Sequence, residues 1–319
     1  MKTRNLLLAL ALMSVGTAYG QSRALPILEV NTNVRNTAMG GNYYGEASNM
    51  LIYSNPTSLL YGEKKLNVST TARFFQGEKV SGATGNNILF GASAAYKLGE
   101  RHGVYVGYRY FGGKKFEIFS ADGVKGKDYT PMSITLDAGY AFRLNENFSA
   151  AVTATFIYDK IARSIDAPAF SIGAAAYYRT ELDISDGANL VLGVNAGNMG
   201  PKIDYGKKSH KKLLPFYFGG GGELSIKLPE YHSVTFSAGA QEYTLPTKAK
   251  MFTANVGAEY TYKEMLSFRA GYNYAEKELS HFAVGAGFAW KNYHLDLAYQ
   301  KGLAGEKNGA FVIGLGFNL

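Results

Sequence analysis

The end of the chain constrains its fold more than any other stretch, because residues 309–319 alternate strictly between two kinds of side chain. One side of this period-2 pattern is apolar and consists of Phe311, Ile313, Leu315, Phe317 and Leu319. The other side carries mostly small or polar residues, namely Val312, Gly314, Gly316 and Asn318. A strand of about this length, tilted at roughly 45°, crosses the hydrocarbon of a bilayer, and its edges must be paired there. We therefore predict that this strand closes a barrel by pairing with the first strand.

The same alternation recurs from residue 64 onward in fourteen runs. They lie near 64–75, 86–97, 103–112, 131–143, 148–158, 169–179, 189–198, 213–227, 232–243, 251–261, 266–275, 281–290, 293–300 and 309–319. The connections are alternately short and long, and the one at 159–168 belongs to the long set, as in bacterial barrels with short periplasmic turns and long outer loops. The pattern predicts an all-β fold, a 14-stranded antiparallel transmembrane β-barrel over residues 64–319. An even strand number places both mature termini on the periplasmic side.

The first twenty residues read as a secretory signal peptide. Lys2 and Arg4 precede an apolar run at 6–13, and small residues lead to a cleavage point before Gln21. This run is too short to span a membrane as a helix, and no later stretch approaches 18 consecutive apolar residues. The chain has no cysteine, which excludes disulfides, thiolate metal sites and a lipid-modified N-terminal cysteine. These features predict an exported protein of the outer membrane of a Gram-negative bacterium.

Composition agrees with a barrel. The chain contains 38 Gly, 24 Tyr and 19 Phe, which are residues that favour strands or let strands curve. The formal net charge of +8 is interpreted as loop charge that faces an anionic surface, with no nucleic-acid partner. A soluble all-β protein is the weaker alternative, because fourteen runs with apolar outer faces leave no second layer to cover them.

Residues 21–63 do not alternate, and we expect them to form a hatch inside the barrel. Arg35 to Gly41 resembles a short helix stopped by glycine, and Asn55-Pro56 resembles the start of a second one. Such a segment can lie in the periplasm or fill the barrel. The second placement is favoured because side chains alone fill only narrow barrels of about eight strands.

Chemistry-bearing patterns are weak. The five histidines, His102, His210, His232, His281 and His294, show no spacing typical of a metal site. No serine lies in a G-x-S-x-G turn. We predict no catalytic residue, no metal site, no cofactor and no enzymatic activity.

Three groups of residues remain as candidate sites. Polar residues on the inward faces are expected to pair with one another, hold the hatch or contact a ligand, and include Arg109, Asp137, Arg143, Arg269 and Asp296. The glycine run predicts a kink that opens the wall or makes room for the hatch, or simple barrel curvature, and consists of Gly219, Gly220, Gly221 and Gly222. Loop lysines are candidates for contact with lipopolysaccharide phosphates or for plain solvation, and include Lys202, Lys207, Lys208, Lys211 and Lys212.

One local motif carries a family resemblance. Its residues are Arg35, Ala38, Met39, Gly40 and Gly41, followed by Asn55 and Pro56. This order, ahead of fourteen strands, resembles the PorV/PorQ family of outer-membrane proteins from Bacteroidetes, which belongs with the FadL-like barrels. The resemblance implies a barrel with an N-terminal hatch, held here by Arg35, Met39, Gly40, Gly41, Asn55 and Pro56.

The resemblance implies two functions. PorV-like proteins act in type IX secretion, where they receive or shuttle cargo, and FadL-like proteins pass hydrophobic molecules through a hatch and a lateral opening. We expect a non-enzymatic component or accessory of type IX secretion, with a FadL-like transporter of hydrophobic small molecules as the alternative. A general porin would need a continuous wet channel, which an apolar hatch disfavours. The expected partners are outer-membrane lipids, secretion-machinery subunits or cargo proteins, and a hydrophobic ligand.

Overall fold

A computed structural model describes residues 25–41, 44–77, 81–119, 123, 125–184, 187–206, 211–276, 279–303 and 309–319. The expected signal peptide, residues 1–20, and the loop residues Lys207, Lys208 and His210 lie outside this described set. Among the described residues, no helix combines the length and the apolar character needed to cross a membrane.

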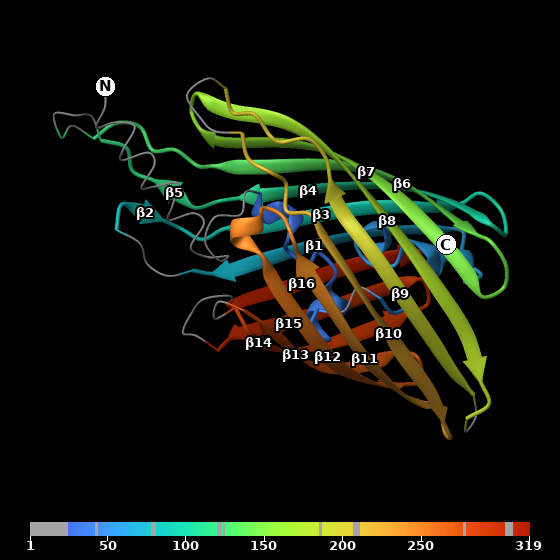
Figure 1. The fold of residues 1–319 in the computed structure, drawn as a ribbon. Helices are drawn as coiled ribbons and strands as arrows, with labels where there is room; N and C mark the ends of the chain where they lie inside the picture. The colour runs from blue at the N-terminus through green and yellow to red at the C-terminus, as the bar shows by residue number, and fades with distance from the viewer. Residues whose placement is uncertain are drawn as a thin grey trace.

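Fourteen antiparallel strands form one closed barrel (Figure 1). They are β1 (Leu66–Gln76), β3 (Ile88–Lys97), β4 (His102–Gly112), β6 (Met132–Arg143), β7 (Phe148–Ala162), β8 (Ile165–Leu182), β9 (Ala188–Met199), β10 (Tyr217–Leu228), β11 (His232–Tyr243), β12 (Met251–Tyr262), β13 (Leu266–Ala275), β14 (His281–Trp290), β15 (Tyr293–Gly302) and β16 (Gly309–Asn318). The last strand pairs with the first from Asn318 opposite Asn67 to Gly309 opposite Gln76. The predicted strand number and closure are both confirmed.

Side-chain burial follows the predicted alternation. Along β16, Phe311 is 41% exposed and Leu315 is 53% exposed, whereas Val312 is only 1% exposed. Large apolar side chains also point outward on the other strands, among them Leu136 and Phe268. The outer surface is therefore apolar, as a wall in contact with lipid requires.

Two features of the loops differ from the sequence prediction. The prediction of a long loop at 159–168 is wrong, because β7 and β8 continue to pair as far as Ala162 opposite Ile165. This extended hairpin packs against Ile203 and Leu214 of a later loop, which the local pattern cannot reveal. A second, two-stranded sheet of β2 (Ala83–Thr84) and β5 (Lys115–Phe116) was not predicted, because two-residue strands carry no periodic signal.

The barrel has two unlike ends. At one end the strands are joined by brief connections at 98–101, 144–147, 183–187, 229–231, 263–265 and 291–292, and β1 begins and β16 finishes there. We call this end the short-turn rim. The longer connections, including β2 and β5, lie at the opposite end of the barrel, which we call the long-loop rim (Figure 1).

The helices in the described part of the N-terminal segment, residues 25–41 and 44–63, are short, and Figure 1 shows their coils within the ring of strands. They are η2 (Pro26–Leu28), α2 (Val34–Ala38), η3 (Leu51–Tyr53) and η4 (Pro56–Leu60), and a further turn, η5 (Thr247–Ala249), precedes β12. The Asn33 side chain caps α2 by accepting from the Asn36 amide at 2.9 Å. The chain leaves α2 through Gly40 and Gly41, with φ of 81° and 105°. The short helices expected at both motifs are present.

Barrel closure can be tested with a disulfide, since the chain has no cysteine of its own. Ala72 and Ile313 face each other across β1 and β16 on the outer surface. Directly opposed residues have Cα atoms about 4.5–5.5 Å apart, which a disulfide spans, whereas diagonal neighbours are about 7–8 Å apart. We expect Ala72→Cys/Ile313→Cys to oxidise readily and to migrate as a compact loop on non-reducing gels. Ala72→Cys/Phe311→Cys is the control, and faster oxidation of the control would contradict this register.

Candidate functional site

An arginine of the N-terminal segment joins two strands of the wall. Arg35, in α2, places Nε 3.1 Å from both carboxylate oxygens of Glu259 on β12, and its Nη2 lies 2.8 Å from Glu259 Oε1. Its Nη1 donates to Glu223 Oε2 on β10 at 2.9 Å. Burial lowers the pKa of the Arg35 guanidinium, but the two carboxylates outweigh this effect and hold the pKa above its usual value. Arg35 therefore stays charged at any physiological pH.

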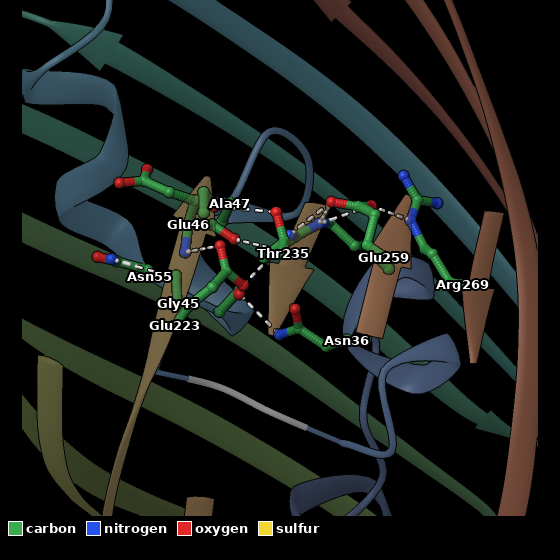
Figure 2. Close-up of polar contacts among 12 residues, drawn as sticks. Asn36, Gly45, Glu46, Ala47, Asn55, Glu223, Thr235, Glu259 and Arg269 are labelled. Carbon is green, nitrogen blue, oxygen red and sulfur yellow. Dashed lines mark hydrogen bonds and ion pairs between the residues drawn. The ribbon is translucent and has the colours of Figure 1, made fainter. Parts of the chain in front are cut away.

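Glu223 is also bound by the backbone of the same segment. The amide of Glu46 donates to Glu223 Oε1 at 3.2 Å, and the Glu46 carbonyl accepts from Arg35 Nη1 at 2.9 Å. Figure 2 shows the Glu223 and Glu259 side chains directed from their strands toward this stretch of chain. The Glu46 carboxylate in turn forms an ion pair with Arg179 of β8. Ion pairs and hydrogen bonds therefore join the N-terminal segment to several strands of the barrel wall.

Two predicted lumen residues extend the same network around the wall. Arg269 of β13 forms an ion pair with Glu259, and its Nη1 lies 2.5 Å from Asp296 Oδ1 of β15. Asn49 of the N-terminal segment donates to the other Asp296 oxygen at 3.0 Å. Arg269 and Asp296 are thus joined to each other, to Glu259 and to the N-terminal segment, and their role as a functional site stays a prediction.

Arg109 and Asp137 form a second buried pair on β4 and β6. Arg109 Nη2 lies 3.1 Å from Asp137 Oδ1, and its Nη1 donates to the Ile27 carbonyl at 3.1 Å. The Tyr53 hydroxyl donates to Asp137 Oδ2 at 2.6 Å, and the Arg109 guanidinium lies 4.5 Å from the centre of the Tyr53 ring. This pair therefore also binds the N-terminal segment, through η2 and η3.

Arg143 behaves differently from the other four polar candidates. It lies at the short-turn end of β6, where its Nε donates to the Asn145 carbonyl at 3.1 Å. Its guanidinium stacks 5.0 Å from the centre of the Tyr61 ring. Arg143 thus contacts the end of the N-terminal segment without joining either buried network.

Glycines on the inner wall let the segment approach the strands closely. A Cβ on Gly285 would lie 2.6 Å from the Ala38 methyl carbon, and one on Gly314 would lie 2.7 Å from Val34 Cγ2. Gly257 and Gly271 lie directly against the backbone of Met39, so larger residues there would displace the segment. The small inward residues of the strands thus match the surface of this segment.

The glycine run of β10 has a similar role. A Cβ on Gly221 would lie 2.7 Å from Tyr44 Cδ2, and a Cβ on Gly239 of the neighbouring strand would lie 2.8 Å from the same atom. Pairing of β10 with β9 and β11 keeps a continuous register through Gly219, Gly220, Gly221 and Gly222. Gly219 and Gly221 leave room for the Tyr44 side chain while the wall remains hydrogen-bonded, whereas Gly220 and Gly222 lie against Val194 and Leu192. An opening at this run stays a prediction.

The remaining motif residues shape the segment itself. The Asn55 side chain accepts from the Thr57 amide at 3.0 Å and donates to the Gly45 carbonyl at 3.0 Å. Pro56 begins η4, and its carbonyl accepts a hydrogen bond from the Tyr105 hydroxyl of β4. Met39 and Gly40 lie against β12 and β13, and the Asn273 side chain donates to the Gly40 carbonyl at 3.0 Å. The motif therefore places the segment on the wall, and its action as a hatch stays a prediction.

Among the cavities that the described residues enclose inside the barrel are two small ones. Each has a volume of about 130 Å³. The first is lined by Tyr53, Arg109, Asp137, Tyr177, Gln241 and Tyr243, and the second by Asn31, Arg73, Asn255, Asn273 and His281 among others. Both are smaller than the roughly 300–1,000 Å³ of most small-molecule sites. The first reaches the wall where β8 and β9 shift register between Ile172 and Ala174.

Several residues of the site were not found from the sequence. Glu223 directly follows the glycine run, which interrupts the alternation that marks an inward position. Tyr44, Glu46 and Tyr53 lie in a segment without any period. In the described parts of the chain, no three histidine, aspartate or glutamate side chains are grouped so that they could hold a metal ion.

The family is shown by comparison with known proteins. A profile described as "Type IX secretion system protein PorV" matches residues 19–250. The chain belongs to the PorV family. A search of curated proteins returned no match.

Solved barrels have the same fold as this PorV-family protein. The toluene transporter TbuX of Ralstonia pickettii is 13% identical with a TM-score of 0.64, covering 92% of this chain and 100% of that one. The toluene transporter TodX of P. putida is also 13% identical, with a TM-score of 0.60 and coverage of 90% and 98%. A FadL homologue of Pseudomonas aeruginosa is 12% identical, with a TM-score of 0.50 and coverage of 90% and 95%. The predicted resemblance to PorV and FadL-like outer-membrane barrels is confirmed.

The role of Arg35 can be measured with a mutant cycle. Removing one partner from a buried ion pair costs about 3–5 kcal/mol, because the other charge is left buried and unpaired. We expect Arg35→Gln to raise hydrogen exchange across residues 25–61 and to lower the free energy of unfolding in detergent by about that amount. Addition of Glu259→Gln should cost less than the sum of the single variants, by about 0.5–3 kcal/mol. Arg163→Gln, at an exposed loop position, is the control, and an equal effect there would contradict the assignment.

Proposed function

We propose that this PorV-family protein is a non-enzymatic binding and assembly component of type IX protein secretion at the outer membrane. We further propose that residues 21–63 form an internal hatch and that the short-turn rim, where β16 ends, faces the periplasm. Leu25, the first described residue, packs at the opposite, long-loop rim, so the structure does not favour the expected periplasmic placement of the N-terminal end. The observation that carries this proposal is the buried charge network through which Arg35, Glu46 and Asn49 of one segment bind strands β8, β10, β12 and β15.

The interior of the barrel supports a scaffold more than a channel. Ion pairs and hydrogen bonds hold the N-terminal segment against the wall, and each of the two lumen cavities has a volume of only about 130 Å³. A hydrophobic molecule in transit would have to displace these buried charges. Breaking each pair is costly, at about 3–5 kcal/mol, so the resting barrel favours a role in which its surface binds partners.

The ends of the barrel suit that role. At the long-loop rim, Ile203, Tyr205 and Leu214 pack with Leu25 and Ile27 of the N-terminal segment. The Tyr205 hydroxyl donates to Asp159 Oδ2 at 2.5 Å, which ties this loop to the β7–β8 hairpin. The described part of this loop is thus folded against the hairpin, and the surface formed in this way is what a secretion partner or cargo domain would recognise.

Transport of hydrophobic small molecules is the second candidate function. It is favoured by the fold shared with two toluene transporters and by the register shift between β8 and β9 next to the first cavity. In that case the hatch would have to move before a ligand could pass.

A pull-down separates the two functions. The tagged protein would be purified from its own outer membrane in mild detergent, and co-purifying proteins and small molecules would be identified by mass spectrometry. Type IX secretion predicts the recovery of secretion subunits or cargo domains. An untagged strain and an unrelated tagged barrel are the controls. Recovery of the protein alone with an acyl or aromatic compound would overturn the secretion proposal in favour of transport.

The hatch is tested separately by conductance in planar bilayers. Removal of residues 21–63 should turn a tight barrel into a leaky one, because fourteen strands enclose more space than their own side chains fill. Arg35→Gln, which keeps the whole chain, should raise the frequency of brief openings, and Arg163→Gln should not. Unchanged conductance of both the deletion and Arg35→Gln would contradict the hatch.

A further inference from the structure

The outer wall carries a large apolar hollow away from the lumen. It extends over β4, β3, β1, β16, β15 and β14 and has a volume of about 730 Å³, more than five times that of either lumen cavity. This volume falls in the range of about 300–1,000 Å³ that is typical of small-molecule sites. The hollow faces the lipid rather than the interior, since its lining includes the outward residues Val106 and Trp290, which are 58% and 52% exposed.

Strand register explains why the wall is hollowed here. Two rows of outward side chains cross the six strands, one of Tyr108, Ala92, Thr70, Leu315, Leu295 and Phe288, the other of Val106, Ala94, Val68, Phe317, Tyr293 and Trp290. The small residues Ala92, Ala94 and Thr70 lie between bulky neighbours on both sides. They form the floor of the hollow, and the aromatic and branched residues form its margins.

The only hydroxyl group of the floor, on Thr70, does not donate a hydrogen bond to an occupant of the hollow. Thr70 Oγ1 donates to the Gly91 carbonyl at 3.0 Å within the wall itself. A polar occupant would lose its hydrogen bonds to water without replacement, whereas a hydrocarbon chain would lose nothing. The hollow therefore fits an alkyl chain.

Positive charge lies at one end of the hollow. Lys291 follows Trp290 in the turn between β14 and β15, and its Nζ lies 4.7 Å from the centre of the Trp290 ring. Lys64 reaches the same turn, where its Nζ donates to Asn292 Oδ1 at 2.9 Å. Lys65 adds a further cation at this rim, and Glu63 adds negative charge.

We propose that this hollow is a binding site for one anionic phospholipid, with an acyl chain on the Ala92–Ala94–Thr70 floor and the phosphate between Lys64 and Lys291. A molecule with a long apolar part and a negative charge at one end matches an apolar trough that leads to two lysines. The proposal does not depend on the secretion role. The choice of a phospholipid over lipid A rests on the orientation proposed above, because the periplasmic leaflet of an outer membrane contains phospholipids.

The chain offers matched controls for both halves of the site. Like Lys291, Lys263 is the first residue of a short turn at the same rim, with φ of 52° against 53°, and its Nζ lies 5.2 Å from the centre of the ring of the preceding residue, Tyr262. Ala254 and Ala258 are outward alanines on β12, outside the hollow. Ala254→Leu/Ala258→Leu is thus a control for Ala92→Leu/Ala94→Leu, which fills the floor.

The test is native mass spectrometry of the full-length protein after delipidation in detergent. Phosphatidylglycerol, phosphatidylcholine with the same acyl chains, or lipid A would be titrated into each variant. Resistance of the unheated barrel to SDS would verify that each variant is folded. The readout is the number of lipids retained and the concentration at which half of the protein carries one.

We expect the unaltered protein to retain one phosphatidylglycerol in preference to phosphatidylcholine. A lysine near an anionic lipid contributes about fivefold in affinity, so Lys291→Gln and Lys64→Gln should each reduce this preference about fivefold, and Lys263→Gln should not. Ala92→Leu/Ala94→Leu should weaken binding of both phospholipids at least tenfold, while the β12 pair leaves it unchanged. Equal retention of both phospholipids, equal effects of test and control variants, tighter binding of lipid A, or a barrel dimer in place of bound lipid would overturn the proposal.

Discussion

Backbone hydrogen bonding in hydrocarbon is the constraint on which the rest of this structure depends. A strand edge left open in lipid would leave several unsatisfied amides and carbonyls, each of which is costly, so the pairing of β1 with β16 is obligatory. Once fourteen strands are closed in this way, the width of the barrel follows, and it exceeds what inward side chains can fill. The N-terminal segment packs against this inner wall, and glycines such as Gly271 and Gly285 are small where the segment passes.

Charge then determines where that segment lies. Buried ion pairs contribute little net stability, but they are costly to mismatch, so they select one arrangement from many similar ones. Arg35 is shared between Glu223 and Glu259, and Arg269 connects Glu259 to Asp296, so one network runs across β10, β12, β13 and β15. A shift of the segment by a single residue would leave charges unpaired in a low-dielectric interior.

The strands could be predicted from the sequence because each lipid-facing strand must alternate apolar outward residues with small or polar inward residues. Runs such as 232–243, 266–275 and 281–290 coincide with β11, β13 and β14 in both bounds. Among the charged candidates, Asp137 and Arg269 could be named from the sequence because each occupies an inward position of a clearly alternating strand. Glu223 was missed because the glycine run before it has no apolar face from which to count. The extension of β7 and β8 was missed because loop residues such as Ile203, distant in sequence, support it.

The sequence by itself determined the closed 14-stranded wall, its apolar exterior and the short helices at Arg35–Gly41 and Asn55–Pro56, because period, glycine and proline act over a few neighbouring residues. Only the tertiary structure decided which charges meet, as with Arg35 and Glu259, which are 224 residues apart. It also decided that Gly221 faces Tyr44 and that Ala92, Ala94 and Thr70 form a hollow on the outer surface. Those contacts depend on the register of the strands and on the path of an aperiodic segment, which arise only when the barrel has closed.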